Sequence, residues 1–136
     1  MARVSIWYVR AALLHFLADV SVGAWQLATP VRLVPVEGGL VRTAHIELLL
    51  VGWLVQLAFG VAVWILPFSR GVSSDRRLWG GWGALNGGLL LVVLGVGTES
   101  VVLELVGRGA EIGAVGAVLL VLWPRVRGVS RRDAGE

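Results

Sequence analysis

The sequence predicts an all-α integral membrane protein, a four-helix bundle whose transmembrane helices leave both termini in the cytoplasm. The chain of 136 residues is 57% hydrophobic and 15% charged, with a mean hydropathy of +0.81, well outside the usual composition of soluble domains. A helix needs about 20 mostly apolar residues to cross a bilayer, and four such runs can be laid out along the chain. Most basic residues fall in connections that this layout places on one side of the membrane.

The four runs fill most of the chain, so we expect a single transmembrane domain over residues 1–136. Their approximate limits are Ile6–Thr29, Thr43–Pro67, Leu78–Gly97 and Ser100–Trp123. The first run could be taken for a signal peptide, but His15 and Asp19 interrupt it and no small-residue cleavage site follows. We therefore treat it as a membrane span.

Proline, glycine and polar residues mark the connections between the spans. Helix-breaking residues after the first span predict a loop, at Pro30, Pro35, Gly38 and Gly39. Pro67 is expected to end the second span, and the polar residues that follow offer caps for the third helix, at Ser73, Ser74 and Asp75. Pro124 is expected to stop the fourth helix, which leaves a flexible basic tail over residues 124–136.

The arginines indicate how the bundle is oriented. The larger set lies on one side of the layout and consists of Arg3, Arg70, Arg76, Arg77, Arg125, Arg127, Arg131 and Arg132, whereas Arg32 and Arg42 lie on the other. The positive-inside rule puts the larger set in the cytoplasm, so we expect a multi-pass protein of the cell inner membrane, in contact with lipid. No basic face of a soluble fold presents the net charge of +3, so nucleic acid is not an expected partner.

The residue inventory limits the chemistry that the chain can perform. It has no cysteine, which excludes disulfides, thiolate metal sites, iron–sulfur clusters and covalently attached c-type haem. Any metal must be held by histidine, by carboxylate or within a cofactor. The sequence shows no nucleophile with its base and no phosphate loop, so a complete catalytic centre is not expected in one chain and enzyme activity is left open.

Small residues on the third and fourth spans predict close helix packing. They repeat every four residues and so share one face of each helix, with Gly80, Ala84 and Gly88 on the third and Gly109, Gly113 and Ala117 on the fourth. Asn86, on the glycine-rich third helix, is expected to form a hydrogen bond between helices.

The second span carries one of the chain's two histidines near its start. At about 100° per residue, Gly52 and Gln56 lie within about 40° of His45. The small Gly52 leaves a groove below the imidazole, where Gln56 can hydrogen-bond a ring substituent or a water. Either His45 binds the metal of a flat macrocycle that stands along the helix, or it sits at the outer interface, hydrogen-bonded to the loop. An ionisable residue inside a span is by default a functional candidate.

Residues 42–67 resemble a haem-binding helix of a known family. The motif TAH (residues 43–45), followed by an apolar run, glycines and WxxP (residues 64–67), resembles the second transmembrane helix of the catalytic subunit of haem–copper oxidases. The stretch RTAHIELLLVGWL (residues 42–54) resembles more closely the corresponding helix of the nitric oxide reductase branch. It also resembles small four-span membrane proteins that are related to that subunit. The rest of the chain resembles the family only as hydrophobic spans.

The resemblance implies a membrane-embedded protein that binds haem b with His45 as axial ligand. Electron transfer or the sensing of a diatomic gas is then the expected function. The oxidase subunit has three arcs of four helices, with further histidines for its binuclear centre, whereas this chain has the size of one arc. We therefore expect a homo-oligomer, with a homotrimer as the specific hypothesis, and a respiratory-chain partner.

Two other functions stay open beside haem binding. One is a non-catalytic structural or assembly subunit of a respiratory membrane complex without cofactor. The other is a proton or ion pathway through the ionisable residues of the spans.

The first span contributes His15 and Asp19, four residues apart on one face. This spacing allows a hydrogen-bonded pair, a proton site or a metal site, but two residues alone are a weak metal signature, and the alternative is that His15 is a neutral histidine satisfied inside the bundle. At about 1.5 Å per residue, His15 is expected to lie about 16 Å deeper than His45. The two histidines are therefore not expected to bind one upright haem.

The fourth span carries an intramembrane charge network. Glu104, Arg108 and Glu111 follow one another at intervals of four and three residues, so they share a face and partly neutralise one another. Glu47 points away from the side of His45 and is expected to join them. Arg108 also suits a haem propionate or a lipid phosphate, because its guanidinium matches both anions. The alternative is a purely structural network that holds helices or subunits together.

Overall fold

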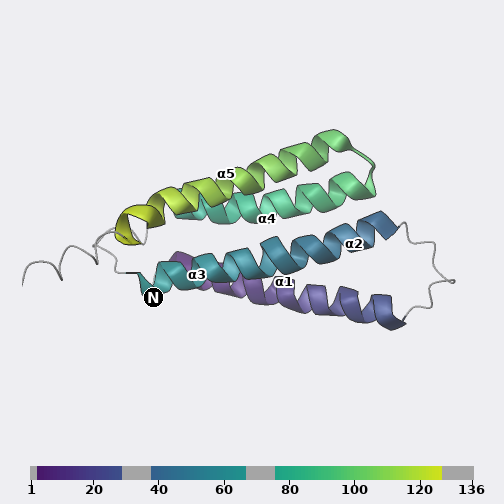
Figure 1. Cartoon of the computed structure of the whole chain (residues 1–136), viewed down its shortest axis with the longest axis horizontal. Coiled ribbons are helices and arrows are strands. Elements are labelled where there is room, and N and C mark those ends of the chain that lie inside the picture. Colours follow the sequence, from purple (N-terminus) through teal and green to yellow (C-terminus); the bar gives the residue numbers. More distant parts are fainter. Residues whose placement is uncertain (1–2, 29–37, 67–75, 127–136) are drawn as a thin grey trace, which may run out of the picture.

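The computed structural model is a bundle of long helices, and it describes residues 3–28, 38–66 and 76–126 (Figure 1). The elements are α1 (Arg3–Ala28), α2 (Gly38–Glu47), the π-helix η1 (Leu48–Val55), α3 (Gln56–Ile65), α4 (Arg76–Gly97) and α5 (Val101–Val126). α2, η1 and α3 follow one another without a break and together form the second span. Four segments are long and apolar enough to cross a membrane, Arg3–Ala28, Gly39–Ile65, Arg76–Gly97 and Val101–Val126. The predicted all-α fold with four spans is confirmed for the described residues.

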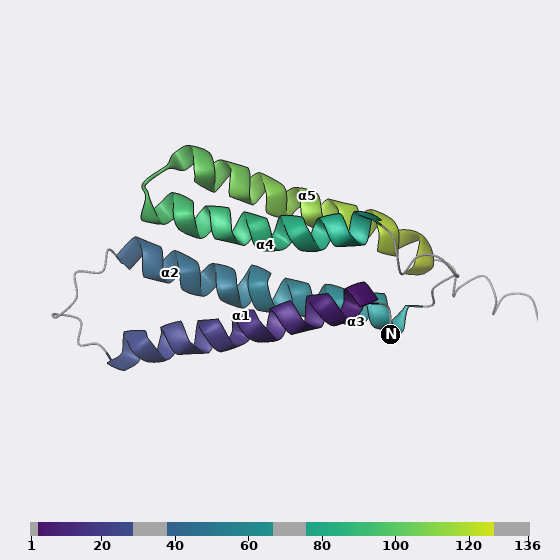
Figure 2. The ribbon, with the colours of Figure 1, turned by 180° about the vertical axis from the view of Figure 1, so that it is seen from behind.

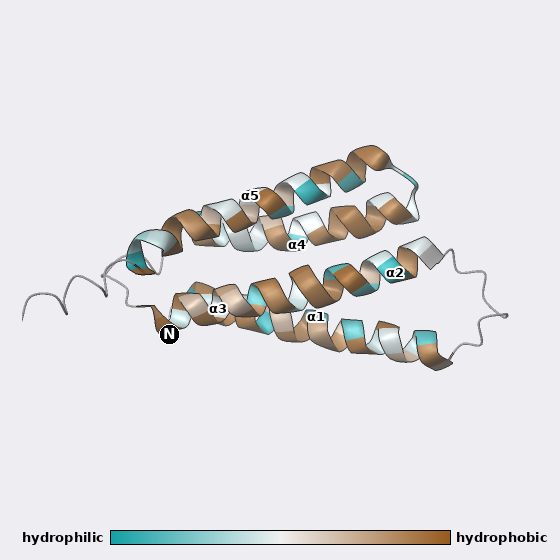
Figure 3. Ribbon diagram, viewed as in Figure 1, coloured by the Kyte–Doolittle hydropathy of each residue, from teal (hydrophilic) through white to brown (hydrophobic). Residues whose placement is uncertain are grey.

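Two antiparallel helix pairs make up the bundle. α1 lies beside the second span and α4 beside α5, and the second span also packs against α4 (Figures 1 and 2). We call the end of the bundle that carries the α4–α5 turn, residues 98–100, the turn end, and the opposite end, where α1 begins, the Arg3 end. Apolar residues cover most of the ribbon, and hydrophilic positions interrupt α1, α2 and α5 toward the turn end (Figure 3).

Two predicted helix limits are wrong. Gly38 and Gly39 do not break the chain but form the first residues of α2, and Pro124 lies inside α5, which continues to Val126. In a membrane every backbone polar group needs an internal partner, so the chain stays helical even where glycine or proline weakens the helix. Residues 124–126 of the expected flexible tail are therefore helical, and residues 127–136 lie outside the described residues. The other expected breakers and caps lie outside the described residues, namely Pro30, Pro35, Pro67, Ser73, Ser74 and Asp75.

The turn between α4 and α5 is a Schellman motif that closes the end of α4. The N–H of Ser100 donates to the carbonyl of Gly95 at 2.8 Å, and the N–H of Glu99 donates to the carbonyl of Val96 at 3.3 Å. Glu99 has a φ of 53°, the left-handed conformation that glycine usually provides at this position. The carbonyl of Ser100 then accepts the N–H of Glu104 at 3.2 Å, which starts α5 directly after the turn.

Glycines bring α4 and α5 into backbone contact, on faces that share only Gly88 with the predicted repeats. The face of α4 repeats every seven residues at Gly81, Gly88 and Gly95, and a Cβ at any of these positions would lie 2.8 Å or less from α5 atoms. On α5, Gly107 meets the carbonyl of Gly88, whereas Gly80, Gly109 and Gly113 have nothing within 4 Å of a built Cβ. A seven-residue repeat is the period of two helices that wind around each other, so it keeps one seam in contact where a four-residue repeat drifts. Asn86 also differs from expectation, since its Nδ2 donates to the carbonyl of Trp82 within α4.

The apolar core lies toward the Arg3 end of the bundle. Its fully buried side chains include Val4, Tyr8, Val63, Leu78, Leu85 and Val118. The Tyr8 hydroxyl donates to the carbonyl of Leu78 at 2.9 Å, and the Ser5 hydroxyl donates to the carbonyl of Gly60 at 2.8 Å. These two bonds join α1 to α4 and to α3. The histidines and carboxylates of the spans, together with Arg108, lie on the other side of this core, closer to the turn end.

Candidate functional site

The second span changes its winding between the two residues that were expected to share a groove. Its α-helix ends at Glu47, a π-helix runs over Leu48–Val55, and α-helix resumes at Gln56. A π-helix turns less per residue than an α-helix and often occurs at functional sites. A constant 100° per residue therefore does not describe the face that joins His45 to Gln56. No sequence signal of the kind used above could have revealed this segment.

His45 lies against α1, where it pairs with Asp19. The His45 Nδ1 is 2.7 Å from the Asp19 Oδ1, an ion-pair distance, although the two buried atoms are not aligned as a hydrogen bond. The Asp19 side chain is 5% exposed and that of His45 is 37% exposed. Gly23 lets the ring approach, because a Cβ there would lie 3.4 Å from the His45 Cε1. Gly23 was missed in the sequence, although it lies four residues after Asp19 on the same face.

The pair of His15 with Asp19 that the spacing allows is not formed, because each has a partner across the helix interface. The His15 Nδ1 lies 3.1 Å from the carbonyl oxygen of Gly52. A carbonyl only accepts, so this bond assigns the ring proton to Nδ1 and leaves Nε2 as the basic nitrogen. Both histidines thus have Nδ1 directed at an acceptor of the protein and a second ring nitrogen that is not used in this way.

The groove expected below His45 is filled. A Cβ at Gly52 would lie 2.9 Å from both Cβ and Cγ of His15 and 3.0 Å from the Leu89 Cδ1. The glycine therefore makes room for a side chain of α1 and one of α4, not for the edge of a macrocycle in the same place. Leu89 could not be foreseen, since nothing in the sequence fixes which turn of α4 faces η1.

The two histidines lie much closer in depth than expected. His45 lies against Asp19 and Gly23, which are four and eight residues from His15, so the levels of the two rings differ by about 6–12 Å at 1.5 Å per residue. The expected difference of about 16 Å is wrong because α2 already begins at Gly38, which places His45 two turns inside the helix. Depth alone therefore no longer separates the two histidines.

Gln56 is fully buried at the start of α3. Neither its Oε1 nor its Nε2 has a hydrogen-bond partner within the described residues. A buried amide without partners is costly. The expectation that Gln56 binds a cofactor substituent or a water stays a prediction.

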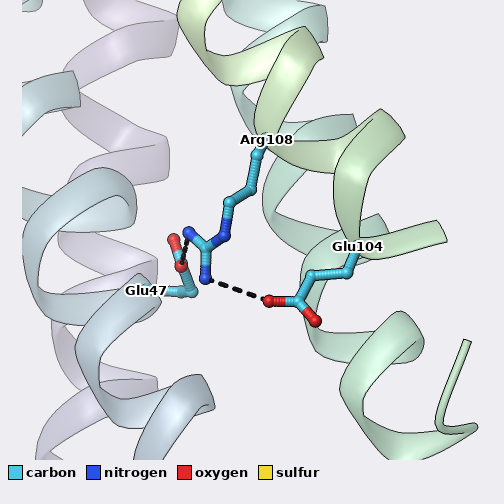
Figure 4. Close-up of polar contacts among 3 residues, drawn as sticks. All are labelled: Glu47, Glu104 and Arg108. Carbon is cyan, nitrogen blue, oxygen red and sulfur yellow. Dashed lines mark hydrogen bonds and ion pairs between the residues drawn. The ribbon is translucent and has the colours of Figure 1, made fainter. Parts of the chain in front are cut away.

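The charge network joins the second span to α5 (Figure 4). The Arg108 Nη1 donates to the Glu47 Oε1 at 2.7 Å, and its Nη2 lies 3.5 Å from the Glu104 Oε1. Glu47 is 5% exposed in its side chain, whereas those of Arg108 and Glu104 are 45% and 37% exposed. Glu111 is buried one turn further along α5 and makes neither contact. The guanidinium is thus occupied by two carboxylates, and a role at a haem propionate or a lipid phosphate stays a prediction.

The metal-binding side chains of the site suit a haem better than a metal ion that is held by protein ligands alone. Within the described residues, no group of three or more histidine and carboxylate side chains is placed to hold a metal ion. A haem iron needs only an axial nitrogen from the protein, and metal-binding histidines usually direct their other ring nitrogen at a carboxylate or carbonyl. His45 with Asp19 fits that pattern, and the filled space at Gly52 does not fit a macrocycle edge.

Comparison with known proteins adds no relative. No protein-family model, no curated protein and no solved structure matches the chain.

Proposed function

We propose that this chain is a b-type haem protein of the cell inner membrane in which His45 is an axial ligand through Nε2. The observation that carries the proposal is the 2.7 Å contact between the His45 Nδ1 and the Asp19 Oδ1 on a side chain that is still 37% exposed. It supports the proposal because a carboxylate at Nδ1 fixes the ring and leaves the other nitrogen for a metal. The resemblance of residues 42–67 to haem-binding helices supports the same residue.

Bound haem b would supply a one-electron couple, so electron transfer is the proposed activity, with the sensing of a diatomic gas as its variant. The Asp19 carboxylate lies 2.7 Å from the His45 Nδ1, where it would orient the imidazole toward a metal. Because His15 and Leu89 fill the space at Gly52, a haem would have to be held by the exposed part of the His45 side chain. A second copy of the chain could cover its other face there, which agrees with a homo-oligomer such as a trimer, working with a respiratory-chain partner.

The test compares absorption spectra of three purified proteins, the wild type, His45→Ala and His15→Ala. We expect a Soret band in the wild type that His45→Ala loses and His15→Ala keeps, because His15 is used for the Gly52 carbonyl. His15→Ala is the matched control, since it removes the other imidazole from the same helix interface. An unchanged Soret band in His45→Ala would refute the proposed ligand.

A second function, a structural or assembly subunit of a respiratory complex without cofactor, is favoured by a different observation. The described residues of α4 and α5 carry glycines that no neighbouring helix covers, including Gly80, Gly83, Gly109 and Gly113. Such positions allow another helix to approach closely. A protein that stays colourless when haem is supplied, and that copurifies with a respiratory complex unless Gly109 and Gly113 are replaced by leucine, would favour this function over haem binding.

A further inference from the structure

Glu111 is a buried carboxyl at the contact between α4 and α5. It is 7% exposed, and its Oε1 is buried without a hydrogen-bond partner within the described residues. Its Cγ would lie 2.8 Å from a Cβ at Gly88, so the side chain occupies space that only a glycine leaves open. The side chain is therefore packed against α4 inside the bundle.

The local charges leave Glu111 without a counter-ion. Arg108 is the cation of this cluster, and it is shared by Glu47 at 2.7 Å and Glu104 at 3.5 Å (Figure 4). Glu111 lies close enough to interact with both Arg108 and Glu47. The described part of α4 has no charged side chain beyond its first turn, at Arg76 and Arg77. An ionised Glu111 would be a third negative charge against one positive charge in a poorly solvated site, which is costly.

The nearest ionisable side chains of α1 do not supply the missing charge. Asp19 is paired with His45 at 2.7 Å, and the Nδ1 of His15 lies 3.1 Å from the carbonyl of Gly52. His15 and Glu111 nevertheless lie at neighbouring levels of the bundle. Gly52 contacts both His15 and Leu89, and Gly88, the residue before Leu89 in α4, contacts Glu111. Glu111 therefore needs a cation that does not come from a side chain.

We propose that Glu111 is an intramembrane proton-binding site, whose carboxylate takes up one proton to form the neutral carboxylic acid and later releases it. A metal cation would need several oxygen ligands, and the described residues contain no group of three or more such side chains placed to hold one. The guanidinium of Arg108 would also repel a metal cation. A proton needs only the unpaired oxygen that Glu111 provides.

The site communicates with the turn end. The Arg108 and Glu104 side chains, one and two turns closer to that end, are 45% and 37% exposed, so the protein covers the cluster less on that side. Toward the Arg3 end, the fully buried Leu85 and Val118 close the bundle. The proton is therefore exchanged with the compartment at the turn end. This inference does not depend on haem at His45.

The test is infrared spectroscopy of the full chain in lipid vesicles, recorded at a series of pH values. We expect the C=O stretch of a protonated carboxyl to appear in the wild type, to vary with pH, and to shift when H₂O is replaced by D₂O. Glu111→Gln keeps the shape of the side chain and should remove this band. Glu104→Gln is the matched control on the same helix and should keep it, because Glu104 is half-exposed and bound by Arg108.

Three results would overturn the proposal. A wild type without a pH-dependent carboxyl band would mean that Glu111 stays ionised or permanently protonated, and this result does not depend on the folding of any variant. A band that persists in Glu111→Gln, with the helical circular dichroism of the wild type, would assign the proton to another carboxyl. A band that does not shift in D₂O would show that the carboxyl does not exchange its proton with water, and would refute the uptake and release of a proton at Glu111.

Discussion

Replacing Gly107 with alanine should push α4 and α5 apart. A Cβ at this position would lie 2.7 Å from the carbonyl oxygen of Gly88, and 2.8 Å from both the N and the Cγ2 atoms of Val92. The shortest of these distances is about 0.7 Å below the 3.4 Å at which ordinary contact begins. Two of the three atoms belong to the backbone, so no side-chain rotation can relieve the overlap.

The size of the effect can be estimated against a neighbouring glycine. Overpacking of a well-packed contact costs about 1–3 kcal/mol, and replacing a helical glycine with alanine returns about 0.5–1 kcal/mol. Gly113 lies on the same helix with nothing within 4 Å of a built Cβ, so Gly113→Ala carries the second term alone. The free energy of unfolding of Gly107→Ala should therefore be lower than that of Gly113→Ala by about 1–3 kcal/mol, since the propensity term cancels.

The assay is equilibrium unfolding in mixed micelles with increasing sodium dodecyl sulfate, followed by helical circular dichroism and tryptophan fluorescence. The wild type, Gly107→Ala and Gly113→Ala are compared under one set of conditions. Gly107→Ala should unfold at a lower fraction of dodecyl sulfate, and Gly113→Ala at or above that of the wild type. Equal stability of the two variants would refute the backbone contact at Gly107 and with it the packing of α4 on α5.

Three further predictions use the same unfolding assay. Glu99→Gly should raise stability by about 1 kcal/mol, because Glu99 holds a left-handed φ of 53° in the α4–α5 turn; a loss of stability would contradict the Schellman turn. Glu47→Gln should lower the free energy of unfolding by about 1 kcal/mol, because it weakens a short contact to Arg108. Glu104→Gln should lower it by less, since the contact of Glu104 with Arg108 is 3.5 Å long and half-exposed. A larger loss in Glu104→Gln than in Glu47→Gln would count against the network. Tyr8→Phe should lose about 1 kcal/mol with the hydrogen bond to the Leu78 carbonyl, and no change would argue against that bond.

Hydropathy predicted the number and type of elements because a bilayer imposes one solution on a long apolar run. The limits were harder to predict, since the rules used for Gly38 and Pro124 come from helices whose ends can be hydrated. Glycine counts correctly indicated close packing of α4 and α5. Of the seam they identified only Gly88, because several glycine repeats coexist on each helix and only the position of the partner selects Gly81, Gly88 and Gly95.

The candidate site was predictable in its residues and not in its pairings. The ionisable side chains inside the spans could be read directly from the sequence, and Arg108 with Glu104 follows from spacing on one helix. The contacts of Asp19 with His45 and of His15 with Gly52 join different helices. They depend on the register between α1 and the second span and on the π-helix within it, neither of which leaves a periodic signal in the sequence.

The reduced-minus-oxidised absorption spectrum of the wild-type protein, purified after expression with added haem, tests the proposed haem site most directly. The account predicts the α, β and Soret bands of a b-type haem, and their loss in His45→Ala while Asp19→Asn keeps haem with altered redox behaviour. A colourless wild-type protein, or identical spectra for the wild type and His45→Ala, would contradict it and leave the contact between His45 and Asp19 as a structural ion pair.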